Sequence, residues 1–463
     1  MKIIKSITIF LFILCLLIPL VFFNFTPNSV SEIDNRKLTE NPFSSEVKGD
    51  LTKNIENYVN DRIGLRDSMI RTYTILNDKL FGKMVHPSYT YGKDGYIFGA
   101  GITTTESFSD YHVAFADMVL KLQEYCEERG VPFLFVFNPA KPAVLSDKLA
   151  EGINYNRDWV EKFLIELDAR NINYVDNTGL LKELMDKGVM TFNQKYDANH
   201  WNDTGAFYGT QNALKALSKL TPNVHINDES EFNIGEEVMT SLMVSDFPIN
   251  EAIPVYSLKL DYENETALYV NDLERHPSYR NLGAFRNETR EAEGNIGALV
   301  FQGSYMNFFG NKFFINAFSE YVYVHDYQNV LDLPYYFNIF KPDCVIFEVA
   351  EYTFSDSYFN YENMLTIDYN EPLCNFSNLE TSTATIKNDD ITVTKGDELT
   401  KLTWQQDEAF EDLWFIADCE YDMKKLDGGY SVTVRNEVYE EYKDSFTITA
   451  HNFKGLTLYS IGE

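Results

Sequence analysis

Two short segments of the sequence combine residue types that could carry out chemistry on a hydroxyl group. In the first, Asp197 stands three residues before His200. An aspartate at this spacing can fold back and accept a hydrogen bond from Nδ1 of the histidine, which fixes the tautomer and leaves Nε2 free as a base. In the second, Ser304 follows Gly303 directly after an apolar run. Gly303 allows a tight turn, and backbone amides that enter the next helix could hold an oxyanion.

Each segment also has an ordinary structural explanation. A single histidine such as His200 is more often structural than catalytic, and a Gly-Ser pair after a strand is most often only a turn. The two segments gain weight together because each lies in a loop that enters a helix, and both loops belong to the same predicted sheet. The elements that would position them therefore decide the interpretation.

Strands and helices alternate through the middle of the chain. Apolar runs predict strands, amphipathic spacing predicts helices, and Gly130 is a good residue to end the first helix. Because the strand at residues 131–138 is apolar throughout, it is typical of a sheet covered on both faces. The pattern predicts a mainly parallel, three-layer α/β domain, with helices at residues 111–129, 156–169, 178–187 and 204–220 and strands at residues 131–138, 172–177, 296–301, 321–326 and 344–349.

The segments on either side of this alternation differ from it. Residues 51–81 show helical spacing that is interrupted near Gly64, and residues 222–295 are polar and less regular. Residues 376–463 contain short alternating runs, with Asp427-Gly428-Gly429 between two of them. Such punctuation is typical of an all-β unit, and we expect a small β-sandwich.

The N-terminus contains an uncharged stretch at residues 7–25, after Lys2 and Lys5. Nineteen residues at a rise of about 1.5 Å just span a hydrocarbon core of about 30 Å. No small-x-small cleavage site follows, so an uncleaved transmembrane signal anchor is favoured over a secretory signal peptide. Since both lysines precede the stretch, we expect a single-pass protein of the cell membrane with its C-terminal bulk outside the cytoplasm.

Charge and cysteine content limit the possible functions. The chain of 463 residues carries 39 basic and 70 acidic residues, for a net charge of −31, which makes nucleic-acid binding improbable. Disulfides are possible outside the cytoplasm. The spacings of Cys126, Cys344, Cys374 and Cys419 fit no metal-binding pattern, and buried free thiols are at least as well supported as disulfides.

Several motifs occur in one order along the chain and resemble those of a known family. They are similar to the motifs of the SGNH hydrolase-like domain of the alginate O-acetyltransferases, the AlgX/AlgJ group. The motifs are Asp34-Asn35-Arg36-Lys37-Leu38, Asp61-Arg62-Ile63-Gly64-Leu65-Arg66, Gly92-Lys93-Asp94-Gly95-Tyr96-Ile97-Phe98, Asn138-Pro139-Ala140-Lys141, His200-Trp201-Asn202-Asp203-Thr204-Gly205-Ala206 and Gly303-Ser304-Tyr305.

The resemblance implies a triad with Ser304 as nucleophile, His200 as base and Asp197 as the residue that orients the base. Two departures from the family pattern stand out. Ala198 occupies the position two before the histidine, where members commonly have aspartate, and Gly303 replaces the aspartate that usually precedes the serine. Asp197, three before the histidine, has the ordinary spacing of SGNH hydrolases.

Further contacts to an oxyanion or to substrate are expected from four residues near these motifs. The candidates are Tyr305, Asn307, Asn199 and Lys141. Lys141 follows a predicted strand together with Asn138 and could either line the same face or belong to a solvated turn. The resemblance implies no metal and no soluble cofactor.

Other polar residues near predicted strand ends are interpreted as structural. Arg62 and Arg66 belong to a motif far from the triad in the sequence. Glu348 and Glu351 could form an acid pair at a strand end, but we interpret them as packing or rim residues. His325 ends another strand and is also expected to be structural.

The expected domains are residues 1–30, a cytoplasmic tip and transmembrane anchor; 31–105, a stalk and helical part; 106–370, an SGNH-like catalytic domain; and 371–463, an accessory β-sandwich. The resemblance implies an extracytoplasmic O-acetyltransferase that modifies hydroxyls of a cell-surface or exported polysaccharide. Its acyl donor would come from a membrane acyl-transfer partner. The alternatives are a carbohydrate esterase with the same triad and a catalytically decayed polysaccharide-binding or assembly protein.

Overall fold

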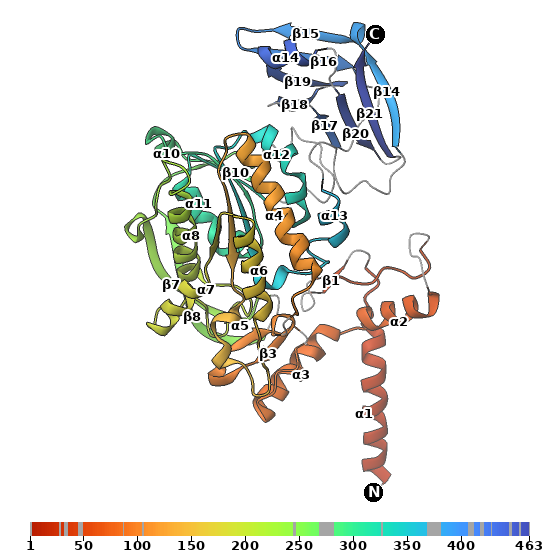
Figure 1. Cartoon of the computed structure of the whole chain (residues 1–463). Coiled ribbons are helices and arrows are strands. Elements are labelled where there is room, and N and C mark those ends of the chain that lie inside the picture. Colours follow the sequence, from red (N-terminus) through yellow and green to blue (C-terminus); the bar gives the residue numbers. More distant parts are fainter. Residues whose placement is uncertain are drawn as a thin grey trace.

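The fold is taken from a computed structural model, which consists of an N-terminal helical part, a central α/β domain and a C-terminal β-rich region (Figure 1). The structure describes residues 2–26, 29–31, 36–44, 50–86, 88–103, 106–243, 247–267, 282–325, 327–367, 381–405, 412–416, 421–426, 428–443, 447–452 and 455–462.

In the described part of the chain, the central sheet has seven strands. Their spatial order is β6 (Tyr174–Asp176), β5 (Phe133–Asn138), β13 (Cys344–Ala350), β11 (Ala298–Phe301), β12 (Glu320–Val324), β10 (Leu282–Arg286) and β9 (Glu263–Asn264). The first five pair parallel with their neighbours. β10 pairs antiparallel with both β12 and β9, so it runs opposite to the other six strands. The prediction of a mainly parallel α/β domain is confirmed.

Helices cover both faces of this sheet, as the apolar strands require. Along β5, Phe133, Phe135 and Phe137 pack into one core cluster, whereas Leu134 and Val136 pack into another. The first cluster includes residues of α4 (Asp110–Glu128), α6 (Asp158–Ala169) and α12 (Leu333–Phe340). The second includes residues of α7 (Thr178–Asp186), α8 (Asp203–Leu217) and α11 (Asn311–Ala317). Because alternate side chains of a strand point to opposite faces, the domain has three layers.

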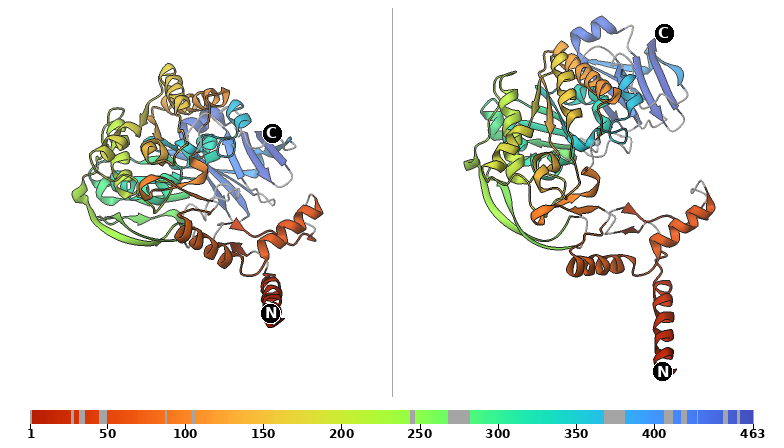
Figure 2. Two further views of the ribbon diagram at one scale, coloured as in Figure 1. Left: turned by 90° about the horizontal axis from the view of Figure 1, so that it is seen from below. Right: turned by 60° about the horizontal axis from the view of Figure 1, so that its bottom comes forward.

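Residues 222–295 contain a long hairpin that the sequence pattern did not indicate. Its strands are β7 (Phe232–Ser241) and β8 (Pro248–Leu258), which pair antiparallel beside α8 (Figure 2). Along β7 the side chains of residues 233–238 are all exposed. A strand without a buried face has no alternation of apolar and polar residues, so period-two analysis cannot detect it.

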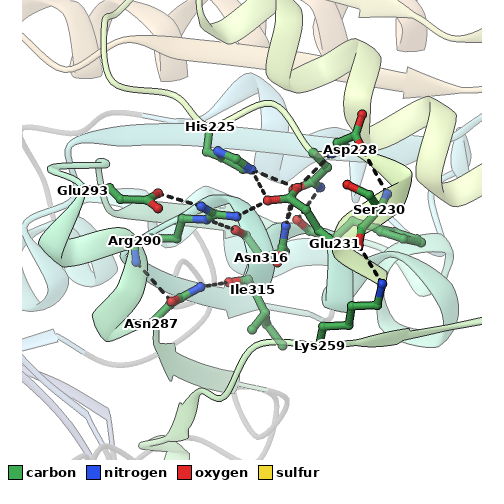
Figure 3. A network of polar contacts seen from close by, with 12 residues as sticks. His225, Asp228, Ser230, Glu231, Lys259, Asn287, Arg290, Glu293, Ile315 and Asn316 are labelled. Carbon is green, nitrogen blue, oxygen red and sulfur yellow. Dashed lines mark hydrogen bonds and ion pairs between the residues drawn. The ribbon is translucent and has the colours of Figure 1, made fainter. Parts of the chain in front are cut away.

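A network of polar contacts fixes the base of this hairpin to the domain (Figure 3). Glu231, directly before β7, accepts hydrogen bonds from Arg290 Nη2 at 2.5 Å and from Asn316 Nδ2 at 3.1 Å. Nε2 of His225 lies 2.9 and 3.0 Å from the two Glu231 oxygens. Arg290 also donates to the carbonyl of Asn316 at 2.6 Å. The start of β7 is therefore tied to α10 (Glu288–Ala292) and α11.

The N-terminal part consists of α1 (Lys2–Val21), α2 (Leu51–Arg62) and α3 (Arg66–Phe81), with the short pairs β1 (Val30–Ser31) with β2 (Arg36–Lys37) and β3 (Tyr89–Tyr91) with β4 (Ile97–Gly99). The predicted interruption near Gly64 separates α2 from α3. The buried Arg62 donates to the carbonyls of Thr39 and Thr26, each at 2.7 Å, in agreement with its structural interpretation.

Among the described residues, no helix is both long and apolar enough to cross a membrane. The anchor expected at residues 7–25 stays a prediction.

The C-terminal region is β-rich, as expected. One four-stranded sheet has the order β14 (Thr381–Lys387), β21 (Gly455–Gly462), β20 (Thr447–Asn452) and β17 (Asp412–Ile416). The other has the order β15 (Ile391–Lys395), β16 (Leu399–Gln405), β19 (Gly429–Arg435) and β18 (Tyr421–Leu426), and α14 (Asn436–Tyr442) follows β19.

The cysteines of the α/β domain are free thiols. Cys126 and Cys344 are both buried, and neither forms a disulfide with another described residue, in agreement with the interpretation of buried thiols. Cys374 and Cys419 lie outside the described residues.

Candidate active site

Three adjacent strands of the central sheet end at one place. The carboxyl ends of β5, β13 and β11 lead into Asn138, Tyr352 and Ser304, respectively, and these strands are neighbours in the order β5-β13-β11. The loop that carries Asp197 and His200 precedes α8, which packs against the same sheet. Carboxyl ends of parallel strands are where open α/β sheets form their active sites.

Asp197, His200 and Ser304 form a continuous hydrogen-bonded chain. Nδ1 of His200 lies 2.8 Å from each Asp197 carboxylate oxygen, and Nε2 lies 2.8 Å from Oγ of Ser304. Asp197 is 2% exposed and His200 is 8% exposed, while Ser304 is partly exposed. With Nδ1–H donated to the carboxylate, Nε2 of the neutral ring can accept the serine proton, which is the arrangement that general-base catalysis needs.

The backbone at Asp197 shapes the loop so that its carboxylate can reach back. Its φ angle is +52°, in the left-handed region where aspartate and asparagine are enriched among non-glycine residues. Oδ1 also accepts hydrogen bonds from the amides of Asn199 and His200 at 3.1 and 3.0 Å. Burial acts to raise the pKa of Asp197, but the His200 ring and these hydrogen bonds outweigh burial and hold the pKa below its ordinary value.

Ser304 begins a helical segment that a π-turn at Met306–Gly310 interrupts before α11. The preceding Gly303 is where this chain departs from the family pattern. A Cβ at Gly303 would lie 3.2 Å from Cε1 of Tyr327 and 3.6 Å from Oε2 of Glu348. The space that a larger side chain would need is therefore already filled by these two residues.

Tyr352 is a site residue that the sequence analysis missed. Its hydroxyl lies 2.9 Å from Ser304 Oγ and 3.2 Å from His200 Nε2. Burial raises the pKa of Tyr352 well above its ordinary value, so the phenol keeps its proton at neutral pH. The only available signal was its place two residues after a buried strand, which carried no motif.

Glu348 lies beneath the serine turn rather than on a rim. Its Oε2 accepts a hydrogen bond from the Gly303 amide at 2.8 Å, and Oε1 accepts one from Asn138 Nδ2 at 2.6 Å. Asn177 Nδ2 in turn donates to Asn138 Oδ1 at 2.7 Å. Burial raises the pKa of Glu348 to about 7, against the hydrogen bonds from Gly303 and Asn138. Of the two interpretations of Glu348, as a packing or a rim residue, its burial agrees with packing and excludes a place on the rim.

Glu351 does not pair with Glu348. It is buried and forms an ion pair with Arg157, with Nε 2.9 Å from Oε1, and it accepts a hydrogen bond from the Ala140 amide at 3.1 Å. His325 Nδ1 lies 2.8 Å from the carbonyl of Gln302, so it contacts the backbone two residues before Ser304. The alternative of an acid pair is therefore wrong. Each glutamate instead accepts a hydrogen bond from a backbone amide in a loop at the end of a strand.

The four oxyanion or substrate candidates are placed differently. The buried Tyr305 hydroxyl donates to the carbonyls of Pro139 and Asn199 at 2.8 and 3.0 Å, and Lys141 Nζ, 0% exposed, donates to the Ile97 carbonyl at 2.8 Å. Tyr305 and Lys141 therefore connect neighbouring loops through hydrogen bonds. The alternative that Lys141 lies in a solvated turn is wrong, because its side chain is buried. Asn307 Oδ1 accepts from Gln302 Nε2 at 2.6 Å, while the buried Asn199 Oδ1 has no hydrogen-bond partner among the described residues.

The raised pKa of Glu348 gives a testable pH dependence of stability. Its ordinary pKa is 4.5, so the folded chain holds this proton more tightly than the unfolded chain does. The free energy of unfolding should therefore fall as pH rises from 4.5 to about 7, by about 3 kcal/mol from this group. In Glu348→Gln this component should be absent.

The measurement is the free energy of unfolding of both proteins in urea at several pH values. The exposed Glu161→Gln substitution on α6 is the matched control, and its curve should run parallel to that of the wild type. Parallel curves for Glu348→Gln would show that the buried carboxyl keeps an ordinary pKa.

Comparison with known proteins gives one family match. Residues 90–245 match the family model of the SGNH hydrolase-like domain, acetyltransferase AlgX. The matched segment includes Asp197 and His200 and ends before Ser304. No curated protein sequence matches significantly.

The solved structures that match this chain are distant from it in sequence. PatB1 of Bacillus cereus with a sulfonyl adduct is 17% identical, with a TM-score of 0.45, over 58% of this chain and 97% of that chain. The O-acetyltransferase domain of Pseudomonas putida AlgJ is 14% identical, with a TM-score of 0.42, over 61% and 99%. Pseudomonas aeruginosa AlgX is 13% identical, with a TM-score of 0.39, over 80% and 90%.

The expected resemblance to the alginate O-acetyltransferase-like group is confirmed by the family match. Residues 90–245 are therefore similar to the SGNH hydrolase-like domain of the AlgX acetyltransferases.

Proposed function

We propose that the protein transfers acetyl groups to hydroxyls of a cell-surface or exported polysaccharide, with Ser304, His200 and Asp197 as its catalytic triad. The observation that carries this proposal is the chain of contacts of 2.8 Å from Asp197 through His200 to Ser304. The family match over residues 90–245 supports acetyl transfer as the reaction class.

In the proposed first half-reaction, Ser304 Oγ attacks the carbonyl carbon of the acetyl donor while Nε2 of His200 takes the serine proton. Asp197 stabilises the imidazolium that forms. The Tyr352 hydroxyl, 2.9 Å from Oγ, could donate a hydrogen bond to the oxyanion that forms beside the serine. When the tetrahedral intermediate collapses, the bond to the donor breaks and its leaving group takes the proton from His200, which leaves an acetyl ester on Ser304.

In the second half-reaction, a sugar hydroxyl attacks the acetyl-serine. His200 Nε2 removes the proton of that hydroxyl and returns it to Ser304 Oγ as the ester bond to the enzyme breaks. The acetylated sugar leaves, and the triad is restored. If water attacked instead, the same residues would act as an esterase, so the choice of acceptor separates the two activities.

Phe308 supports a sugar rather than water as acceptor. It is 55% exposed, and its ring centroid lies 5.4 Å from that of His200. An exposed ring beside the base offers an apolar surface that a sugar ring can cover, whereas water gains nothing from it. The π-turn at Met306–Gly310 is the element that presents this side chain.

We therefore predict that Phe308→Ala weakens acceptor binding without damaging the triad. The KM for an oligosaccharide acceptor should rise about 5- to 10-fold, as expected for the loss of about 1 kcal/mol of apolar contact. Hydrolysis of a small acetyl ester should stay near the wild-type rate. Initial rates over a range of acceptor concentrations test this, with the exposed Phe43→Ala as control. An unchanged acceptor KM would remove Phe308 from the acceptor site.

The proposal also includes the parts of the chain around the α/β domain. The uncharged stretch at residues 7–25, with Lys2 and Lys5 before it, supports membrane anchoring with the enzymatic part outside the cytoplasm. A membrane acyl-transfer partner would then supply the acetyl group, and the β-rich region would act as an accessory module. Protease treatment of intact spheroplasts tests this topology, since a full-length protected protein in the soluble fraction would contradict it.

The experiment that tests the reaction uses the purified protein with a p-nitrophenyl acetate donor and a panel of oligosaccharides. We expect acetylated sugar to form and p-nitrophenol release to depend on the acceptor. Release that is independent of any sugar would favour the esterase, and no release together with sugar binding would favour the polysaccharide-binding protein.

A further inference from the structure

A carboxylate from the β7–β8 hairpin binds the loop that carries the proposed orienting residue. Oε1 of Glu251, on β8, accepts a hydrogen bond from the amide of Gln194 at 2.6 Å. Its Oε2 accepts from the amides of Lys195 and Tyr196 at 2.9 and 2.6 Å. These are three successive backbone donors, and the next residue in the chain is Asp197. Hydrogen bonds to an ionised carboxylate are among the stronger ones in proteins.

This loop has no helix or strand to hold it. The residues from 189 to 202 contain no regular secondary structure, so their backbone groups depend on contacts with other segments. The Ile97 amide donates to the carbonyl of Gln194 at 2.9 Å, and the Gly99 amide donates to that of Ala198 at 3.2 Å. The amides of residues 194–196 are bound instead by Glu251.

Lys141 completes the attachment from below. Its fully buried ammonium donates to the carbonyl of Ile97 at 2.8 Å and contacts that of Gln194 at 3.5 Å. Burial lowers the pKa of Lys141 to about 8, against the opposing charges of Asp197 and Glu251. The ammonium of Lys141 therefore contacts one carbonyl of the loop and one of the adjacent β4, while the Glu251 carboxylate binds three amides of the loop.

The hairpin itself is a fixed support. Its base is held by the Glu231, Arg290 and His225 network (Figure 3). Near its other end, Leu242 and Phe247 pack with Ala198 in one buried apolar cluster. The hairpin therefore contacts the chain on both sides of Asp197, through Glu251 at residues 194–196 and through Leu242 and Phe247 at Ala198.

We propose that Glu251 is a positioning residue for the acetyl transfer: by binding three consecutive amides it fixes the backbone at Asp197, and with it the orientation of His200. This inference rests on the proposed function. Glu251 touches neither substrate nor the reacting atoms, so it acts only through the alignment of Asp197 with His200. A displacement of the Asp197 carboxylate by about 1 Å would misalign His200 and lower the rate of acylation.

The test compares Glu251→Gln, Glu251→Ala and Glu251→Asp with the exposed Glu236→Gln on β7 of the same hairpin. The side-chain amide of glutamine accepts hydrogen bonds at one oxygen only, so Glu251→Gln loses part of the contacts. Glu251→Asp keeps both acceptor oxygens. We expect kcat on a small acetyl ester to fall about 10- to 100-fold in Glu251→Gln and further in Glu251→Ala, with KM nearly unchanged. Glu251→Asp should be intermediate, and Glu236→Gln should match the wild type.

Two further readouts separate positioning from a general loss of structure. The rate of Ser304 labelling by a fluorophosphonate should fall in parallel with kcat, although labelling needs neither donor nor sugar. The final extent of labelling should stay at the wild-type value, because a misaligned site reacts slowly but completely. A merely structural role would lower that final extent and leave the labelling rate of the remaining active enzyme in place.

The outcomes also distinguish this inference from the proposed function. If the wild type labels at Ser304 and transfers acetyl groups, but Glu251→Ala retains its labelling rate, the positioning role is overturned and the function stands. If the wild type labels at Ser304 but no sugar is acetylated, the proposed function fails, and the loss of labelling in Glu251→Ala would still support the positioning role.

Discussion

Ser304→Ala should abolish acetyl transfer, with a fall in turnover of about a thousand-fold or more. Ser304 Oγ is 2.8 Å from the His200 ring nitrogen that would take its proton, and alanine leaves no atom there to carry the acetyl group. The measurement is p-nitrophenol release together with mass spectrometry of the peptide that contains Ser304, which should carry acetyl in the wild type only.

The double variant Ser304→Ala/His200→Ala should be hardly slower than either single variant. Residues that act as a unit in one step lose their joint contribution when any one is removed, so their effects are strongly non-additive. The exposed Ser68→Ala, on α3, serves as the control and should keep full activity. Wild-type rates in Ser304→Ala, on both ester and glycan acceptor, would show that the nucleophile lies elsewhere.

Asp197→Asn should lower kcat by about 10²- to 10⁴-fold, less than Ser304→Ala, because the nucleophile stays in place. Asparagine tolerates the φ angle of +52° found at this position, so the substitution tests charge and tautomer rather than backbone strain. Without the carboxylate, the imidazolium of His200 loses its stabilising partner, which lies 2.8 Å from Nδ1.

Labelling of Ser304 by a fluorophosphonate provides the second measurement for Asp197→Asn. Its rate should fall in parallel with kcat, because both reactions need His200 as the base. The exposed Asp186→Asn, on α7, should change neither rate. Full rates of both reactions in Asp197→Asn would assign the orienting role to another residue.

Local sequence was sufficient for the parts of the site that lie close together in the chain. Asp197 and His200 are three residues apart, so a single loop conformation brings the carboxylate to the ring, and their spacing alone predicted the contact. The apolar strands predicted the covered parallel sheet for a similar reason. A strand that is buried on both faces consists of successive apolar residues, and such a run can be recognised locally.

The convergence of Ser304 with His200 needed the fold as well. The two residues are 104 positions apart, and their contact depends on β11 and α8 meeting at one end of the sheet. The sequence predicted that both lie in loops of that sheet, which made the pairing a reasonable hypothesis. It did not predict their separation, because distances between elements depend on how whole helices and strands pack.

Tertiary structure alone decided the residues that surround the triad. Tyr352 reaches Ser304 across 48 residues, Glu348 binds the Gly303 amide across 45, and Glu251 binds the Tyr196 amide across 55. None of these contacts leaves a periodic or local pattern, because a hydrogen bond between distant segments constrains only the two atoms that meet. The sequence therefore determined the sheet and the candidate triad, while the packing of the hairpin and of β13 determined what positions that triad and encloses it.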